Sequence, residues 1–197
     1  MNNVGSVSDM INSSIVVVTK PSVSTFEMFE RRGNLTSALI YVGLGAIVTA
    51  ILGAIASPAG IVGGILSGLI GTILGFVIFT YAVFFIGKSQ GGTGTYDEVA
   101  YSFSLFSVPL AVIGAVVGLI GRVLPLLGCL VGLPISLALL VAQIYFGYLA
   151  VQSSMNLRDS GKAIITLVVA AILSLIVTVI IAAIFGGAAL LGGAIAS

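Results

Sequence analysis

Residues Leu35–Gly87 read LTSALIYVGLGAIVTAILGAIASPAGIVGGILSGLIGTILGFVIFTYAVFFIG and contain no charged side chain. A helix of about 20 apolar residues crosses a hydrocarbon core of about 30 Å, so this stretch is more than twice as long as one crossing requires. Ser57-Pro58 divides it near the middle, and proline ends a helix because its ring removes a backbone donor. The sequence therefore predicts two membrane spans here, over 36–57 and 61–87.

Three further stretches carry almost no charge and predict three more spans, over 99–121, 126–155 and 163–185. Hydrophobic residues make up 59% of the 197 residues and charged residues only 7%, whereas soluble proteins average about 25% charged residues. With a mean hydropathy of +1.29, the chain is too apolar for the alternative to a membrane protein, which is an unusually hydrophobic soluble domain. We therefore expect an all-α, polytopic transmembrane bundle of five spans over 36–185, followed by a tail of small uncharged residues, 186–197.

The basic residues are distributed unevenly between the two ends of such a bundle. Arg122 lies at the end opposite to the N-terminus, and the other six lie on the N-terminal side: Lys20, Arg31, Arg32, Lys88, Arg158 and Lys162. In membrane proteins the cytoplasmic loops carry the excess of Lys and Arg. The sequence therefore predicts an integral membrane protein with a cytoplasmic N-terminal segment over 1–35 and a C-terminus outside.

A capping box precedes the first span. Ser24 and Glu27 have the spacing at which each side chain bonds a free backbone N–H of a new helix, which predicts a short helix over 24–32. Its aromatic and charged sides favour a helix that lies in the plane of the membrane interface. The alternative is that it caps the first span and packs on the cytoplasmic ends of the bundle. The residues predicted to lie at the membrane interface are Phe26, Phe29, Arg31 and Arg32.

Thr95 and Glu98 form a second capping box, so the third helix is expected to begin in the headgroup region. The glycine-rich segment before it, Ser89–Thr95, contains too few apolar residues to be buried and predicts a flexible loop. Two prolines, Pro109 and Pro134, predict kinks in the third and fourth spans.

Small residues recur every four positions in the second span. Because lipid tails are as apolar as leucine, helices in a bilayer associate by close packing, and small residues allow their backbones to approach. The expected packing residues are Gly60, Gly64, Gly68, Gly71 and Gly75. We expect these contacts within one chain, with a dimer as the alternative. Gln143 is the most polar side chain deep in a span, and it is expected to bond a neighbouring helix or to line a small polar cavity.

The sequence offers no set of residues for catalysis or for binding a metal. It contains no histidine, and its single cysteine, Cys129, lies in an apolar run. The carboxylates all lie near the predicted cytoplasmic face, whereas ion-coupled transporters ordinarily use ionisable groups inside the membrane. We therefore expect no enzymatic activity, no metal and no cofactor. The net charge of +1 predicts no binding of nucleic acid.

Three groups of short segments follow one another along the chain. They are Thr19-Lys20-Pro21 with Ser24-Thr25-Phe26-Glu27; Gly91-Gly92-Thr93-Gly94-Thr95-Tyr96 with Ala100-Tyr101-Ser102 and Val108-Pro109; and Arg158-Asp159-Ser160-Gly161-Lys162-Ala163. Together they resemble the Yip-domain proteins, a family named for interaction with Ypt/Rab GTPases, over about Thr19 to Phe185. The short segment ahead of the first span is similar to that of the short prokaryotic members.

The resemblance implies a non-enzymatic membrane protein. Eukaryotic members are associated with membrane trafficking, Rab binding and membrane shaping, so binding of a small GTPase is implied by the resemblance alone. Similarity to the short members implies a prokaryotic plasma membrane.

Together, these observations predict a membrane-organising or adaptor protein, or an accessory subunit of a larger membrane complex. Its expected partners are the lipid bilayer and either other membrane proteins or a second copy of the chain. The alternative is a channel or facilitator for a small solute, which the two prolines and Gln143 motivate.

Overall fold

The computed structural model describes residues 6–54, 60–124, 126 and 128–195, and every regular element in these residues is a helix. The elements are α1 (Val7–Thr19), α2 (Val23–Phe29), α3 (Leu35–Ala54), α4 (Gly60–Ser89), α5 (Tyr96–Val123), the π-helix η1 (Gly128–Gly132), α7 (Leu133–Ser154) and α8 (Ser160–Ile195). Five of the helical segments are long and apolar enough to cross a membrane: those of α3, α4, α5, η1 with α7, and α8. The predicted five-span helical bundle is confirmed.

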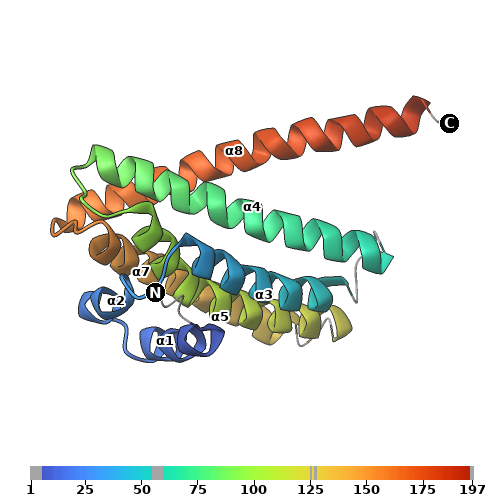
Figure 1. Ribbon diagram of the computed structural model, residues 1–197. Helices are drawn as coiled ribbons and strands as arrows, with labels where there is room; N and C mark the ends of the chain where they lie inside the picture. The colour runs from blue at the N-terminus through green and yellow to red at the C-terminus, as the bar shows by residue number, and fades with distance from the viewer. Residues whose placement is uncertain (1–5, 55–59, 125, 127, 196–197) are drawn as a thin grey trace.

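The spans pack as neighbours in an order that differs from their order in the chain (Figure 1). Helix α3 packs against both α4 and α5, α7 packs against α5, and α8 crosses α4. Helix α1 lies against α5, and α2 lies against α7. The turns around 30–34, 90–95 and 155–159 gather at one end of the bundle, which we call the basic end. The opposite end, where α3 and α5 finish, is the far end.

Capping side chains determine where three of the helices begin. At α5, the Thr95 backbone N–H donates to Glu98 Oε2 at 2.7 Å and the Glu98 N–H donates to Thr95 Oγ1 at 3.3 Å, which confirms the predicted box. Helix α1, which the sequence analysis did not predict, begins with a similar box between Ser6 and Asp9. Both boxes satisfy backbone donors that the first turn of a helix leaves free.

Helix α2 begins earlier than predicted. Its cap is Ser22, whose Oγ accepts a hydrogen bond from Thr25 N at 3.1 Å, so the capping box expected between Ser24 and Glu27 is wrong. The Thr25 hydroxyl also donates to the Lys20 carbonyl at 2.9 Å, and this bond closes the turn around Ser22. The helix ends at Phe29, before the two arginines that follow.

The two prolines behave differently in their spans. Pro109 lies inside α5 without ending it, whereas Pro134 lies in the first turn of α7, directly after the π-helical residues. Proline is tolerated in a first turn because the N–H that it lacks would be unpaired there. Helix α8 continues beyond Phe185 to Ile195, so most of the expected tail is helical. The predicted break at Ser57-Pro58 lies outside the described residues.

An aromatic chain connects four elements near the basic end. Phe79 of α4 lies 5.5 Å from Phe103 of α5, and Phe103 lies 5.3 Å from Phe106 on the same helix. Phe106 in turn contacts Phe26 of α2 at 6.1 Å and Phe146 of α7 at 5.8 Å, all measured between ring centroids. Edge-to-face and stacked pairs at these distances add to the stability that burial provides. The best-packed core therefore lies toward the basic end.

Candidate functional site

A buried carboxylate lies at the basic end, where α2 meets α7. Glu30 is only 4% exposed, and it accepts a hydrogen bond from the Ser153 hydroxyl of α7. Its pKa lies above the ordinary value of 4.5, mainly because burial disfavours the charged form. The Ser153 hydrogen bond opposes this rise in pKa, and the negative charge of Glu98 adds to it.

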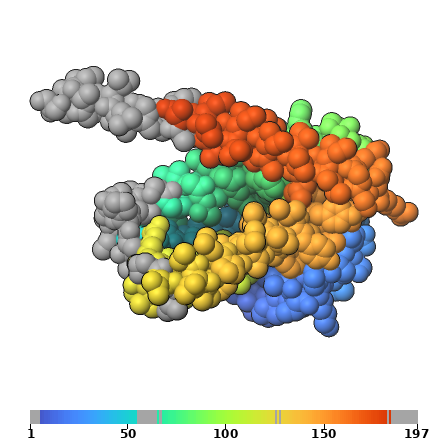
Figure 2. Space-filling view, turned by 180° about the vertical axis from the view of Figure 1, so that it is seen from behind, coloured from blue at the N-terminus to red at the C-terminus, as the bar shows by residue number. Residues whose placement is uncertain are grey.

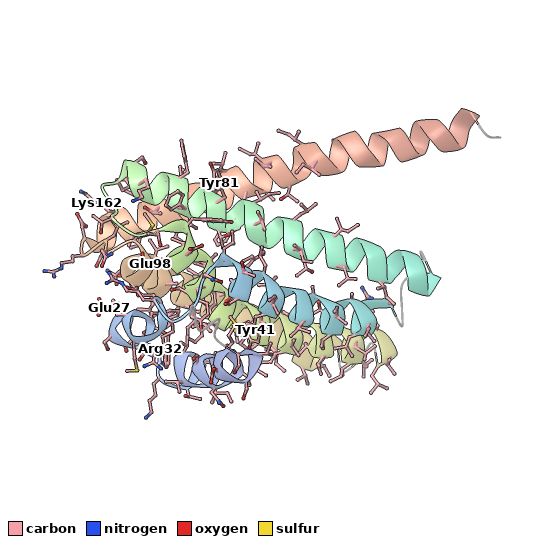
Figure 3. All side chains as sticks on the ribbon, in the orientation of Figure 1. Glu27, Arg32, Tyr41, Tyr81, Glu98 and Lys162 are labelled. Atoms are coloured by element: carbon pink, nitrogen blue, oxygen red, sulfur yellow. The ribbon has the colours of Figure 1, made fainter. Side chains whose placement is uncertain are left out.

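Arg31 connects this carboxylate to the beginning of α5. Its Nε lies 3.1 Å from Glu98 Oε1 and 3.8 Å from Glu30 Oε1. The neighbouring Asp97 accepts a hydrogen bond from Leu35 N at 3.1 Å and so caps α3. We call the five residues that make these contacts the polar junction: Glu30, Arg31, Asp97, Glu98 and Ser153. The junction joins α2, α3, α5 and α7 at the basic end, where Figure 3 shows Glu98.

The contacts of the polar junction hold neighbouring helices together. Each of its carboxylates has a hydrogen-bonding or ionic partner on another element or at a helix cap. In the part of the chain that the structure describes, no three His, Cys, Asp or Glu residues are grouped so that they could bind a metal ion. The sequence signal for the burial of Glu30 is its position four residues after Phe26, on the same helical face.

The residues predicted for the membrane interface separate into two pairs. Phe26 is fully buried and Phe29 is 7% exposed, because the aromatic side of α2 faces α5 and α7. The rings therefore pack inside the protein, as in the alternative that the sequence left open, and do not form an outward face. Arg31 and Arg32 are exposed, and the Arg32 guanidinium carbon lies 5.0 Å from the centroid of the Phe29 ring.

The glycines predicted for packing have unequal surroundings. A Cβ atom at Gly68 would lie 3.1 Å from the Ala50 Cβ of α3, so the two backbones approach closely there. A Cβ at Gly71 or Gly75 would meet nothing within 4 Å. The surroundings of Gly60 and Gly64 lie outside the described side chains.

The glycine-rich segment between α4 and α5 is packed rather than free. A Cβ at Gly94 would overlap the carbonyl of Ser154, and Thr93 N donates to the Met155 carbonyl at 3.1 Å. Gly92 and Gly94 are both buried, which corrects the expectation of a flexible loop. Glycine allows this close approach because it has no side chain to exclude the neighbouring backbone.

A cavity of about 280 Å³ lies among the spans. We call it the intramembrane cavity. Gln143 lines this cavity and is exposed, and the cavity around it is mainly apolar. The other lining residues are mainly aromatic, aliphatic or small: Val42, Gly45, Ala46, Thr72, Gly75, Phe76, Phe79, Phe103, Phe106, Ser107, Val108, Ala111, Gly147 and Leu167. Figure 2 shows the hollow on this side of the molecule, between α7 and α8, with α4 in teal behind it.

Comparison with known protein families identifies one match that covers most of the chain. A family model described as Yip1 domain matches residues 15–182, from within α1 to within α8. No curated protein and no solved structure matches the chain.

Proposed function

The chain belongs to the Yip1 domain family, and from this membership and the unpacked side of the bundle we propose that it is a non-enzymatic membrane-organising or adaptor protein, acting as an accessory subunit of a larger complex. The Yip1 family is not known for enzymatic activity. Its partners in this proposal are the bilayer and the membrane helices of other proteins. A small GTPase is the soluble partner that the family suggests.

The observation that carries the proposal is the exposure of α7 and α8. In the most apolar stretch of α3, 39% of the residues are buried, compared with 6% in η1 with α7 and 11% in α8. Large apolar side chains point outward on several sides of α8: Ile164, Ile165, Val168, Val169, Ile172, Leu173, Leu175, Ile176, Val179 and Ile180. A helix that packs against little within its own chain is available to pack against a partner helix.

The orientation of the complex follows from the basic end. We place this end at the cytoplasmic face, because Lys20, Lys88, Arg158 and both arginines after α2 lie there while Arg122 lies at the far end. The N-terminus is then cytoplasmic and the C-terminus outside.

Native mass spectrometry of the tagged chain, extracted from native membranes in nanodiscs, tests the proposal. We expect a stoichiometric assembly that contains a second membrane protein. Ile176→Ala on α8 should weaken this assembly. Ile47 is a similarly exposed isoleucine on the well-packed α3, and Ile47→Ala should leave the assembly intact. A chain that is always recovered alone would refute the accessory role.

The intramembrane cavity supports a second candidate, a channel or facilitator for a small solute. Thr72, Ser107 and Gln143 give this cavity polar groups at membrane depth. Solute flux into proteoliposomes should then exceed that of empty vesicles and should fall in Gln143→Leu. Flux at the background rate would remove this candidate.

A further inference from the structure

A second cavity, of about 540 Å³, lies at the basic end, apart from the intramembrane cavity. Its walls come from α1, from α2 and the turn after it, and from α5. The lining residues are Asp9, Asn12, Ser13, Val16, Phe29, Arg31, Arg32 and Tyr101. We call it the arginine pocket, and we propose that it binds the phosphate group of an anionic membrane lipid.

Two guanidinium groups supply the positive side of the arginine pocket. Arg31 lines the pocket while its Nε lies 3.1 Å from Glu98 Oε1 and 3.8 Å from Glu30 Oε1, so part of its charge is already compensated. Arg32 makes no ion pair with the described carboxylates, and its guanidinium lies over the Phe29 ring. Guanidinium groups bind phosphate oxygens through two parallel hydrogen bonds, so the donors of Arg32 suit a phosphate group and Arg31 adds positive charge beside them.

The turn that carries the arginines is fixed against α5. A Cβ atom at Gly33 would overlap the Tyr101 ring, so only glycine lets this turn lie directly on the ring. Tyr101 is 1% exposed, and Arg32 N donates to the Phe29 carbonyl at 2.8 Å. The backbone that carries the two arginines is thus in place before any ligand arrives, which lowers the entropy that binding costs.

The opposite wall of the arginine pocket is polar, with a single acidic group. Ser13 is a buried polar residue of the lining, and Asn12 is an exposed one. Asp9 is the acidic residue of the lining, but its Oδ2 accepts hydrogen bonds from Ser6 N at 3.1 Å and Ser6 Oγ at 2.8 Å. The lining holds two arginines and one aspartate, and since Arg31 is paired with Glu98, Arg32 is the guanidinium that no described carboxylate pairs.

The surroundings favour a lipid as the source of the phosphate. The outer face of α1 exposes Ile11 and Ile15, one helical turn apart, and α2 exposes Met28. The arginines lie just before α3, an apolar helix long enough to span a membrane, so a lipid headgroup beside the start of this span would lie within their reach. A cationic pocket suits the phosphate headgroup of a phospholipid, and the apolar side chains beside it suit the acyl chains. A soluble phosphate would make no contact with these apolar side chains.

Titration of the detergent-purified full chain with phosphatidylglycerol, followed by native mass spectrometry, tests the proposal. We expect saturable binding of one lipid, with about tenfold weaker affinity in Arg32→Gln, because a charged hydrogen bond is lost. Arg158→Gln is the matched control, since Arg158 is an exposed arginine at the same end but outside the pocket. Equal losses in both variants would indicate diffuse surface attraction and would overturn the pocket.

A second pair of variants leaves both arginines in place. Asn12→Asp adds a negative charge inside the pocket and should also weaken phosphatidylglycerol binding, while Asn156→Asp adds the same charge at an exposed turn and should not. Inorganic phosphate distinguishes the two sources of the ligand. Failure of millimolar phosphate to compete supports a lipid, and full displacement by it would overturn the lipid assignment. The outcome does not depend on finding a protein partner, so this site and the proposed accessory role can fail separately.

Discussion

The basic end and the far end of the bundle contain similarly apolar helices but are joined in different ways. At the basic end, the polar junction, the buried glycine-rich segment and the aromatic chain fasten neighbouring elements together. Along α7 and the described side chains of α8 few residues are buried, and at the far end Arg122 donates a hydrogen bond to the Gly53 carbonyl at 3.2 Å. Apolar side chains therefore allow a helix to enter the bilayer but do not determine which helices it packs against. Polar, aromatic and glycine contacts determine that packing.

The largest effect should come from filling the closest backbone contact of the basic end. Gly94→Ala places a methyl group where the Ser154 carbonyl lies, and backbone cannot move aside as a flexible side chain can. We expect a loss of about 3 kcal/mol of stability, measured by thermal unfolding in detergent. Gly71→Ala, in open surroundings, should not destabilise the protein. Equal melting temperatures for both variants would contradict the difference between the two ends.

The next effect should come from the polar junction itself. Glu30→Ala removes the acceptor for Ser153, whose side chain is fully buried, so we expect a loss of about 2 kcal/mol. Glu30→Gln keeps an acceptor and removes the buried charge, so it should cost less than Glu30→Ala. Glu27→Ala, a change of an exposed glutamate on the same helix, is the control and should lie within about 0.5 kcal/mol of wild type. The order of the three variants in an unfolding experiment sharpens the comparison.

The raised pKa of Glu30 predicts a dependence of stability on pH. As pH rises above 4.5, this carboxyl loses its proton in the unfolded chain before it does so in the folded chain. The contribution of Glu30 to folding is therefore fully present below that pH and is lost as pH rises through the folded-state pKa. The difference in free energy of unfolding between wild type and Glu30→Gln, measured at increasing pH from below 4.5, should show that loss. A flat difference would mean that Glu30 titrates in the folded protein as it does in solution.

The smallest effect should come from the far end. Arg122→Gln removes one exposed hydrogen bond to the end of α3 and should cost about 0.5 kcal/mol in the same unfolding assay. A loss as large as that of Glu30→Ala would show that the far end is fastened as firmly as the basic end.

The fold follows from sequence patterns wherever the signal is local. Uncharged length predicts the five spans, and the spacing of Thr95 and Glu98 predicts the beginning of α5. Local spacing failed at α2, because both Ser22 and Ser24 can cap a helix and the contact that decides between them is the bond from Thr25 to Lys20.

The candidate site was less predictable because its contacts join distant parts of the chain. Glu30 and Ser153 are 123 positions apart, and neither has a local pattern that names its partner. An aromatic face such as that of Phe26 and Phe29 suits lipid and protein equally well, so periodicity does not distinguish an outward helix from a buried one. The glycines after α4 were the available signal for a buried segment, since glycine marks close approach as well as flexibility.

The length of α8 has a consequence for the bilayer around it. Its 36 residues extend about 54 Å at 1.5 Å per residue, whereas a hydrocarbon core is about 30 Å thick. The helix carries no charged residue after Lys162 that would favour water over lipid. Such a hydrophobic mismatch is relieved by tilting the helix or by thickening the membrane locally, and either response makes the fit of this protein depend on the thickness of the membrane that contains it.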